Sequence, residues 1–221
     1  MKNLFGNSFM TGRSRFVLFS IAVILSLILI VLSTFVHLDF FRQFDFRSMI
    51  SIQKISRPQI DFLFSLLTIL GSTEMTFLVI LIIISVLFIR KKNLYLSIFL
   101  YILIYPLELL GKLLIYHPKP PVFLSRYVFD FHLPSSFIIE TSYSYPSGHM
   151  ARSAFLVSLL VFLIKREKLS PAKNKFLFLI LIIYLFLMFI SRIYLGEHWF
   201  SDVLGGTILG IMISQISLSL W

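Results

Sequence analysis

Long apolar runs alternate with short polar segments along the whole chain. A helix needs about 20 mainly apolar residues, at roughly 1.5 Å of rise each, to cross the hydrocarbon core of a bilayer. The stretch 60–72 is apolar but short, and Gly71-Ser72 separates it from the next run, so we expect a half-buried or interfacial helix there. The pattern predicts an all-α fold, an integral membrane six-transmembrane-helix bundle that forms one domain over residues 1–221, with spans at 16–38, about 74–90, about 93–115, about 149–165, about 175–193 and 202–221.

The first apolar run resembles a secretory signal in one respect, because basic residues precede it. The run is 23 residues long, however, and no small-residue cleavage site follows it. We therefore expect an uncleaved first span. The segment 39–59 mixes Phe and Ile with Arg and Lys, which is typical of a segment that lies among lipid headgroups.

Composition supports a membrane protein. The chain is 58% hydrophobic and 14% charged, with a mean hydropathy of +0.93, whereas soluble domains have about 25% charged residues. The net charge of +10 arises largely from three segments, which precede residue 16, occupy 90–92 and occupy 165–175. With six spans these segments share one side, and the positive-inside rule makes that side cytoplasmic. The charge is thus a topology signal, and no nucleic-acid partner is expected. The lack of cysteine excludes thiolate nucleophiles and Cys-ligated metals.

Several ionisable residues fall at the opposite, outer surface. Lys112, His149 and Arg192 each lie 16 to 20 residues from a lysine of the cytoplasmic segments, which is roughly 25–30 Å along a helix. His198 and Asp202 follow Arg192 directly. Ionisable groups at membrane spans are costly and indicate function. The spacing alone therefore predicts that three distant segments contribute to one site.

The residue types at this surface suit a phosphate. Lys112, Lys119 and Arg192 are cations, which bind phosphate oxygens well. In "PSGH", Ser147 and Gly148 come just before a predicted helix, where free N–H groups and the helix dipole attract an anion. Together they predict an anion site.

Two histidines accompany the predicted anion site. His198 and Asp202 are spaced i, i+4, so they can share a helix face, and the carboxylate would then fix the imidazole tautomer. An imidazole oriented in this way can attack phosphorus, while His149 can protonate the departing oxygen.

Three gapped motifs in this order resemble a known family. The segments "KLLIYHPKP" (112–120), "PSGH" (146–149) and "SRIYLGEHWFSD" (191–202) are similar to the K-x6-R-P, P-S-G-H and S-R-x5-H-x3-D signature of the type 2 phosphatidic acid phosphatase superfamily. The motif-bearing core covers about 105–210, and six spans are the usual layout of that family.

The resemblance implies a role for each matching catalytic position. His198 would be the nucleophile that forms a phosphohistidine, Asp202 would orient it, and His149 would be the general acid for the leaving lipid alcohol. Glu197 lies beside the nucleophile, but the mechanism of the family needs no carboxylate there, so we expect no catalytic role for it.

The resemblance also implies a phosphate site made of Lys112, Arg192, Ser147 and the backbone of Gly148, without a metal or another cofactor. Lys119 stands where the family has arginine. Lysine keeps the positive charge but loses the planar fork of donors, so the geometry of phosphate binding at this position should differ.

Other polar residues have simpler explanations. Glu108 precedes Lys112 by four residues, so we expect the two to pair. Arg152 could either join the site or reach the headgroups, and we expect His117 to lie outside the pocket. The GxxxG pattern at 206–210 predicts close helix packing.

The sequence thus predicts a membrane lipid phosphatase acting on a phosphomonoester or pyrophosphate at the outer face, in a bacterial inner membrane. Phosphatidic acid, phosphatidylglycerol phosphate, undecaprenyl pyrophosphate and a lipid A phosphate all fit the site equally. A lipid phosphotransferase would use the same residues, and a non-enzymatic lipid-binding protein is a further alternative. Vanadate-dependent haloperoxidases share such an anion pocket, but they are soluble, which argues against them here. The sequence does not define an oligomeric state.

Overall fold

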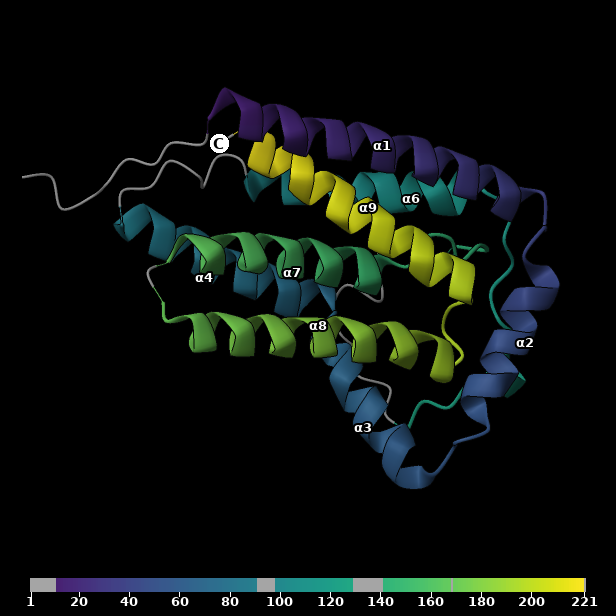
Figure 1. Ribbon diagram of the computed structural model, residues 1–221. Helices are drawn as coiled ribbons and strands as arrows, with labels where there is room; N and C mark the ends of the chain where they lie inside the picture. The colour runs from purple at the N-terminus through teal and green to yellow at the C-terminus, as the bar shows by residue number, and fades with distance from the viewer. Residues whose placement is uncertain (1–10, 91–97, 129–140, 168, 221) are drawn as a thin grey trace, which may run out of the picture.

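Every regular element that the structure describes is helical (Figure 1). The computed structural model describes residues 11–90, 98–128, 141–167 and 169–220. The elements in chain order are α1 (Gly12–His37), α2 (Arg42–Gln53), α3 (Pro58–Ile69), α4 (Thr73–Ile89), the 3-10 helix η1 (Phe99–Leu103), α6 (Ile104–Leu114), the 3-10 helix η2 (Val122–Leu124), α7 (Gly148–Arg166), α8 (Pro171–Tyr194) and α9 (Phe200–Ser219).

Four described helices are long and apolar enough to cross a membrane, namely α1, α7, α8 and α9. They coincide with the predicted first, fourth, fifth and sixth spans. The helices α3 and α4 form a fifth candidate, bent by 47° at the Gly71-Ser72 break that the sequence indicated. Of the predicted span 93–115, residues 93–97 lie outside the described residues, and the rest forms η1 and the 11-residue α6. The all-α membrane fold is confirmed, whereas the count of six spans is not.

Helix α9 lies at the centre of the bundle, between α1 and α7 (Figure 1). The contact between α7 and α9 depends on glycines, because a Cβ atom at Gly206 or Gly210 would collide with the carbonyl oxygen of Ser147 or Ala151. The close packing predicted from the GxxxG pattern is therefore confirmed, and it brings the start of α7 against the first turns of α9.

The outer helices present apolar side chains to their surroundings. Of the 18 most apolar consecutive residues in each helix, only 11% in α1 and 22% in α8 are buried inside the protein, compared with 67% in α9. Large side chains such as Leu27 and Phe186 are exposed on these helices. In a bilayer this surface contacts lipid tails, so its exposure has no hydrophobic cost.

Helix α2 crosses the end of the bundle where α8 ends and α9 begins (Figure 1). It is fixed there by two buried polar side chains. Asp45 accepts hydrogen bonds from the amide and the hydroxyl of Ser201, at 2.8 and 2.7 Å. Gln53 donates to the carbonyl oxygens of Leu124 and Tyr194, at 2.8 and 2.9 Å. The polar end of the bundle is thus closed by α2 rather than left open.

Candidate active site

The site begins where two motif-bearing helices start side by side. Ser147 is the N-cap of α7, and its amide donates to the carbonyl oxygen of Asp202 in the first turn of α9 at 3.0 Å. The side chain of Asp202 in turn accepts the amide of Trp199, the N-cap of α9, at 2.9 Å. One backbone hydrogen bond therefore joins the second and third motifs.

Arg192 lies almost fully buried near the end of α8, where three groups hold its guanidinium. Its Nη1 atom donates to Thr68 of α3 and to the hydroxyl of Tyr127 at 3.0 Å, and its Nη2 atom donates to Glu197 at 3.4 Å. Glu197 is the most exposed of these partners and contacts the arginine rather than a histidine. The bent α3–α4 pair thus supplies a hydrogen-bond acceptor, Thr68, to Arg192 of the third motif.

Two buried polar atoms of the motifs have no hydrogen-bond partner among the described residues. They are the hydroxyl oxygen of Ser147 and the Nε atom of Arg192. An unpaired polar atom in a buried place costs roughly 1–3 kcal/mol, so each of the two calls for a partner such as a water molecule or a ligand. Both belong to the set that the resemblance assigns to phosphate.

Lys112 is paired with a carboxylate, as the sequence predicted. Its Nζ atom lies 2.7 Å from Glu108, and the same carboxylate lies 2.8 Å from Arg152 of α7. Arg152 also donates to the carbonyl oxygen of Gly71 at 3.3 Å. A Cβ atom at Gly148 would collide with the carboxylate of Glu108, so this carboxylate touches the positive end of α7.

The charged groups of the three motifs act on one another. His149 lies within electrostatic range of Lys112, Arg152, Arg192 and His198. The structure therefore brings together residues from α6, α7, α8 and the turn before α9, which the sequence separates by up to 86 positions. Arg152 belongs to this cluster rather than to the headgroup surface.

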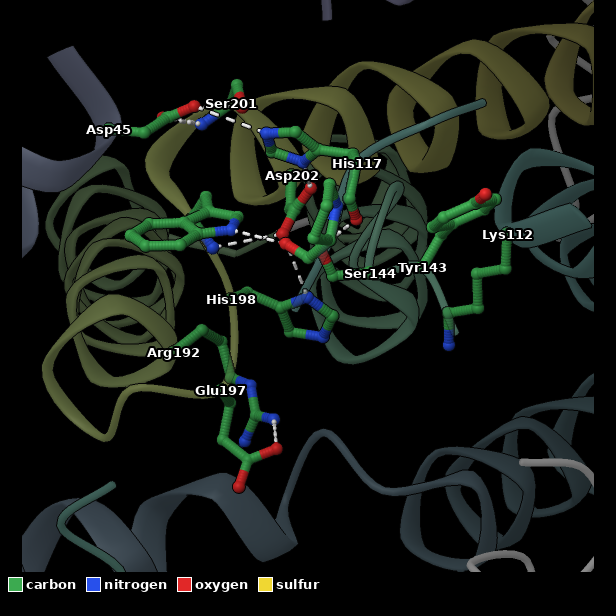
Figure 2. A network of polar contacts seen from close by, with 12 residues as sticks. Asp45, Lys112, His117, Tyr143, Ser144, Arg192, Glu197, His198, Ser201 and Asp202 are labelled. Carbon is green, nitrogen blue, oxygen red and sulfur yellow. Dashed lines mark hydrogen bonds and ion pairs between the residues drawn. The ribbon is translucent and has the colours of Figure 1, made fainter. Parts of the chain in front are cut away.

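His198 lies in the turn between α8 and α9, between Asp202 and the Arg192–Glu197 pair (Figure 2). Its Nδ1 atom is 3.4 Å from a carboxylate oxygen of Asp202. Burial lowers the pKa of His198, and Arg192 and Lys112 act in the same direction, against the opposite effect of Asp202. The imidazole is therefore uncharged at neutral pH, with its Nε2 atom directed away from Asp202.

His117 is buried, although the sequence analysis placed it outside the pocket. Its Nδ1 atom lies 2.6 Å from the other carboxylate oxygen of Asp202, and its Nε2 atom lies 3.5 Å from Asp45 (Figure 2). The expectation was wrong because the two carboxylates, from α2 and α9, compensate for the burial of an imidazole. Sequence reasoning missed Asp45 entirely, since nothing in its surroundings differs from an ordinary interfacial segment.

Lys119 does not join the cluster through a direct contact with another described side chain. It is exposed and lines a cavity of about 330 Å³ together with Arg42, Tyr116, His117 and Trp199. The neighbouring Pro118 fixes this segment, because its carbonyl oxygen accepts the indole N–H of Trp199 at 2.7 Å. Among the described residues, no group of three or more His, Asp and Glu side chains is arranged to hold a metal ion.

Known proteins resemble this chain in sequence and in fold. Phosphatidylglycerophosphatase B of Bacillus subtilis is 37% identical over 75 residues, or 34% of this chain, and undecaprenyl-diphosphatase of Sulfolobus acidocaldarius is 36% identical over 107 residues, or 44% of this chain. The matched segments span 37% and 47% of these relatives.

Two crystal structures are similar over most of their length. That of a transmembrane PAP2 type phosphatidylglycerolphosphate phosphatase from Bacillus subtilis has a TM-score of 0.72 and 25% identity, covering 90% of this chain and 94% of that one. Aquifex aeolicus LpxE has a TM-score of 0.59 and 23% identity over 79% of this chain and 94% of its own, a level that shows the fold alone. The sequence model of the PAP2 superfamily matches residues 77–221, which contain all three motifs, and the chain therefore belongs to the PAP2 superfamily.

Proposed function

We propose that this protein is a lipid phosphatase of the membrane, which hydrolyses a phosphomonoester or pyrophosphate through a phosphohistidine intermediate. The observation that carries the proposal is the pair of unpartnered buried donors, Ser147 Oγ and Arg192 Nε, with Arg192 in electrostatic range of His149 and His198. A phosphate group would satisfy both donors, and Lys112 would complete its charge balance.

In the first step, Nε2 of His198 attacks phosphorus and the bond from phosphorus to the leaving oxygen breaks. His149 gives its proton to that oxygen, so that a lipid alcohol or a lipid monophosphate departs. The hydrogen bond from Nδ1–H of His198 to Asp202 stabilises the positive charge that develops on the ring. Fixed cations and the start of α7 stabilise the charge that develops on the phosphoryl oxygens.

In the second step, water replaces the lipid. His149 accepts a proton from the water molecule as it attacks phosphorus, and the bond between nitrogen and phosphorus breaks. Inorganic phosphate leaves, and both histidines return to their starting protonation states.

An apolar cavity beside the second motif suits the lipid tail. It has a volume of about 220 Å³ and is lined by α1, α6 and α9, with Leu107, Leu110 and Leu114 along one wall. Tyr145 and Pro146, which directly precede Ser147, also line it. A substrate whose phosphate lies at Ser147 can therefore place its first methylene groups in this cavity, and we infer that it arrives from within the bilayer.

The substrate class follows from the phosphate or pyrophosphate headgroup that the site would bind. Phosphatidylglycerol phosphate and undecaprenyl pyrophosphate are the first candidates, since similar proteins carry those names. We further propose that the site faces the outside of a bacterial inner membrane, because the basic segments before residue 16 and at 165–175 belong on the cytoplasmic side.

The test is a phosphate-release assay on purified protein in mixed micelles, with phosphatidic acid, phosphatidylglycerol phosphate, undecaprenyl pyrophosphate and a lipid A phosphate, each with EDTA present. We expect release from at least one lipid, abolished in His198→Ala. Protein quenched in alkaline denaturant should carry an acid-labile, base-stable phosphoryl group in wild type and in the control His37→Ala, but not in His198→Ala. Full turnover by His198→Ala would contradict the mechanism, and loss of turnover in EDTA would contradict its independence of metal.

A further inference from the structure

His117 connects two buried carboxylates that come from opposite ends of the chain. Asp45 of α2 lies 3.5 Å from its Nε2 atom, and Asp202 of α9 lies 2.6 Å from its Nδ1 atom. The contact of Asp202 with His117 is thus shorter than its contact with His198, at 3.4 Å. Figure 2 shows the resulting chain of groups, Asp45–His117–Asp202–His198.

The geometry defines the charge on this imidazole. A carboxylate accepts a hydrogen bond but cannot donate one, so a ring nitrogen that faces it must carry a proton. His117 faces a carboxylate at each nitrogen and is therefore an imidazolium. Burial opposes this charge, but the hydrogen bonds to Asp202 and Asp45 outweigh burial and raise the pKa of His117 to about 9.

We propose that His117 is a positioning residue for the nucleophile, which fixes the carboxylate of Asp202 and neutralises part of its charge so that His198 stays uncharged and free to attack. This inference rests on the proposed function, because it gives His198 the role of nucleophile. His117 touches neither the phosphate nor His198 in a described contact and acts through Asp202 alone.

The surroundings of both histidines are consistent with this division of charge. His117 faces Asp45 from α2 and Asp202 from α9, with the Trp199 ring 6.5 Å away, and the cavity beside it adds the charged side chains of Asp39, Arg42 and Lys119.

His198 faces Asp202 on one side, and it interacts electrostatically with Lys112, Glu108, His149 and Arg192. Asp202 is the carboxylate in direct contact with His198, so the charge that Asp202 retains determines how readily His198 takes up a proton. An imidazolium beside Asp202 weakens that effect.

The pH dependence of kcat/KM tests the proposal, because its acid limb reports the protonation of the nucleophile in the free enzyme. His117→Gln removes the positive charge and keeps an amide donor near the position of Nε2. We expect its acid limb to move to higher pH by about one unit or more, and its kcat to fall by about 10- to 100-fold.

His117→Arg is the matched rescue, because a guanidinium keeps the charge and can donate to both carboxylates. Its acid limb should stay at the wild-type position. Asp39→Asn, which removes an exposed carboxylate from the same cavity, should behave as wild type. A folded His117→Gln protein with the wild-type acid limb would overturn the proposal, and so would a folded His117→Arg protein displaced as far as His117→Gln.

A second measurement does not depend on turnover. In protein labelled with ¹⁵N-histidine and held in detergent micelles, the ring nitrogens of His117, assigned by their loss in His117→Gln, should both carry protons at pH 7.5. A neutral His117 at that pH would overturn the inference whether or not the enzyme is active. By contrast, turnover in His198→Ala would overturn the proposed function and leave the charge state of His117 as measured.

Discussion

The carboxylate of Glu108 lies 2.8 Å from the guanidinium of Arg152 and 2.7 Å from the ammonium group of Lys112. One buried carboxylate therefore pairs with two cations, from α6 and α7, directly beside the first residue of α7. This arrangement leads to the first of four predictions.

Replacing Glu108 with glutamine should destabilise the protein. The change leaves Lys112 and Arg152 without a counterion in a largely buried place, and removing one partner from such a pair costs about 3–5 kcal/mol. Thermal unfolding in detergent, followed by circular dichroism, measures the effect. Glu167→Gln is the control, because Glu167 pairs with Arg90 at the surface and should contribute less than about 1 kcal/mol. Equal melting temperatures for Glu108→Gln and wild type would contradict the structural importance of this pair.

Replacing Thr68 with valine should weaken phosphate binding. Thr68 accepts a hydrogen bond from Arg192, and it also accepts one from Tyr127 at 3.3 Å. A lost hydrogen bond to a charged group is worth about 1.5–3 kcal/mol, so we expect the inhibition constant for vanadate to rise about 10-fold or more. Thr34→Val is the control, since among the described residues the hydroxyl of Thr34 donates to a carbonyl of its own exposed helix. An unchanged inhibition constant in Thr68→Val would show that Arg192 holds its position without α3.

Replacing Leu110 with tryptophan should discriminate against long lipid tails. The larger ring would fill the apolar cavity between α1, α6 and α9, whose wall includes Leu110. We expect kcat/KM to fall for a long-chain lipid phosphate but to stay near wild type for a short-chain, water-soluble phosphate monoester. Leu113→Trp, on the exposed face of the same helix outside the cavity, should change neither value. An equal loss of kcat/KM on both substrates would contradict the assignment of this cavity to the lipid tail.

Stability should depend on pH through His117. Its pKa is about 9 in the folded protein, above the value of about 6.5 expected when unfolded, so the folded state binds the proton more tightly. The resulting stabilisation is complete below about pH 6.5 and is lost as the pH rises through 9. The difference in melting temperature between wild type and His117→Gln should therefore shrink from pH 6.5 to pH 9.5. A difference that stays constant over this range would contradict the raised pKa.

The sequence predicted the long helices well, because a continuous apolar run of span length has few alternatives in a membrane protein. It also predicted the Glu108–Lys112 pair and the GxxxG contact, since both follow from helical spacing alone. The break between α3 and α4 was visible as Gly71-Ser72, but its consequence was not, since a bend of 47° depends on what the two helices pack against.

The supporting residues of the site could not be predicted for a different reason. Asp45, Thr68 and His117 act through contacts with residues that lie 72 to 156 positions away, and no local pattern marks such pairs. His117 is the clearest case. Its burial depends on carboxylates from α2 and α9, and only the assembled fold shows that both are present.

The residues that hold the motifs in place lie partly outside the region by which the family is detected. The family match begins at residue 77, whereas Asp45 and Thr68 precede it and hold groups of the first and third motifs, and Gly71 accepts a hydrogen bond from Arg152, one turn beyond the second motif. Consider a chimera that joins the motif region of this protein to α1, α2 and the bent α3–α4 pair of a relative. It would contain the reactive groups but would lack the residues that position them. The unit that recombination can exchange intact is thus the whole chain rather than its signature.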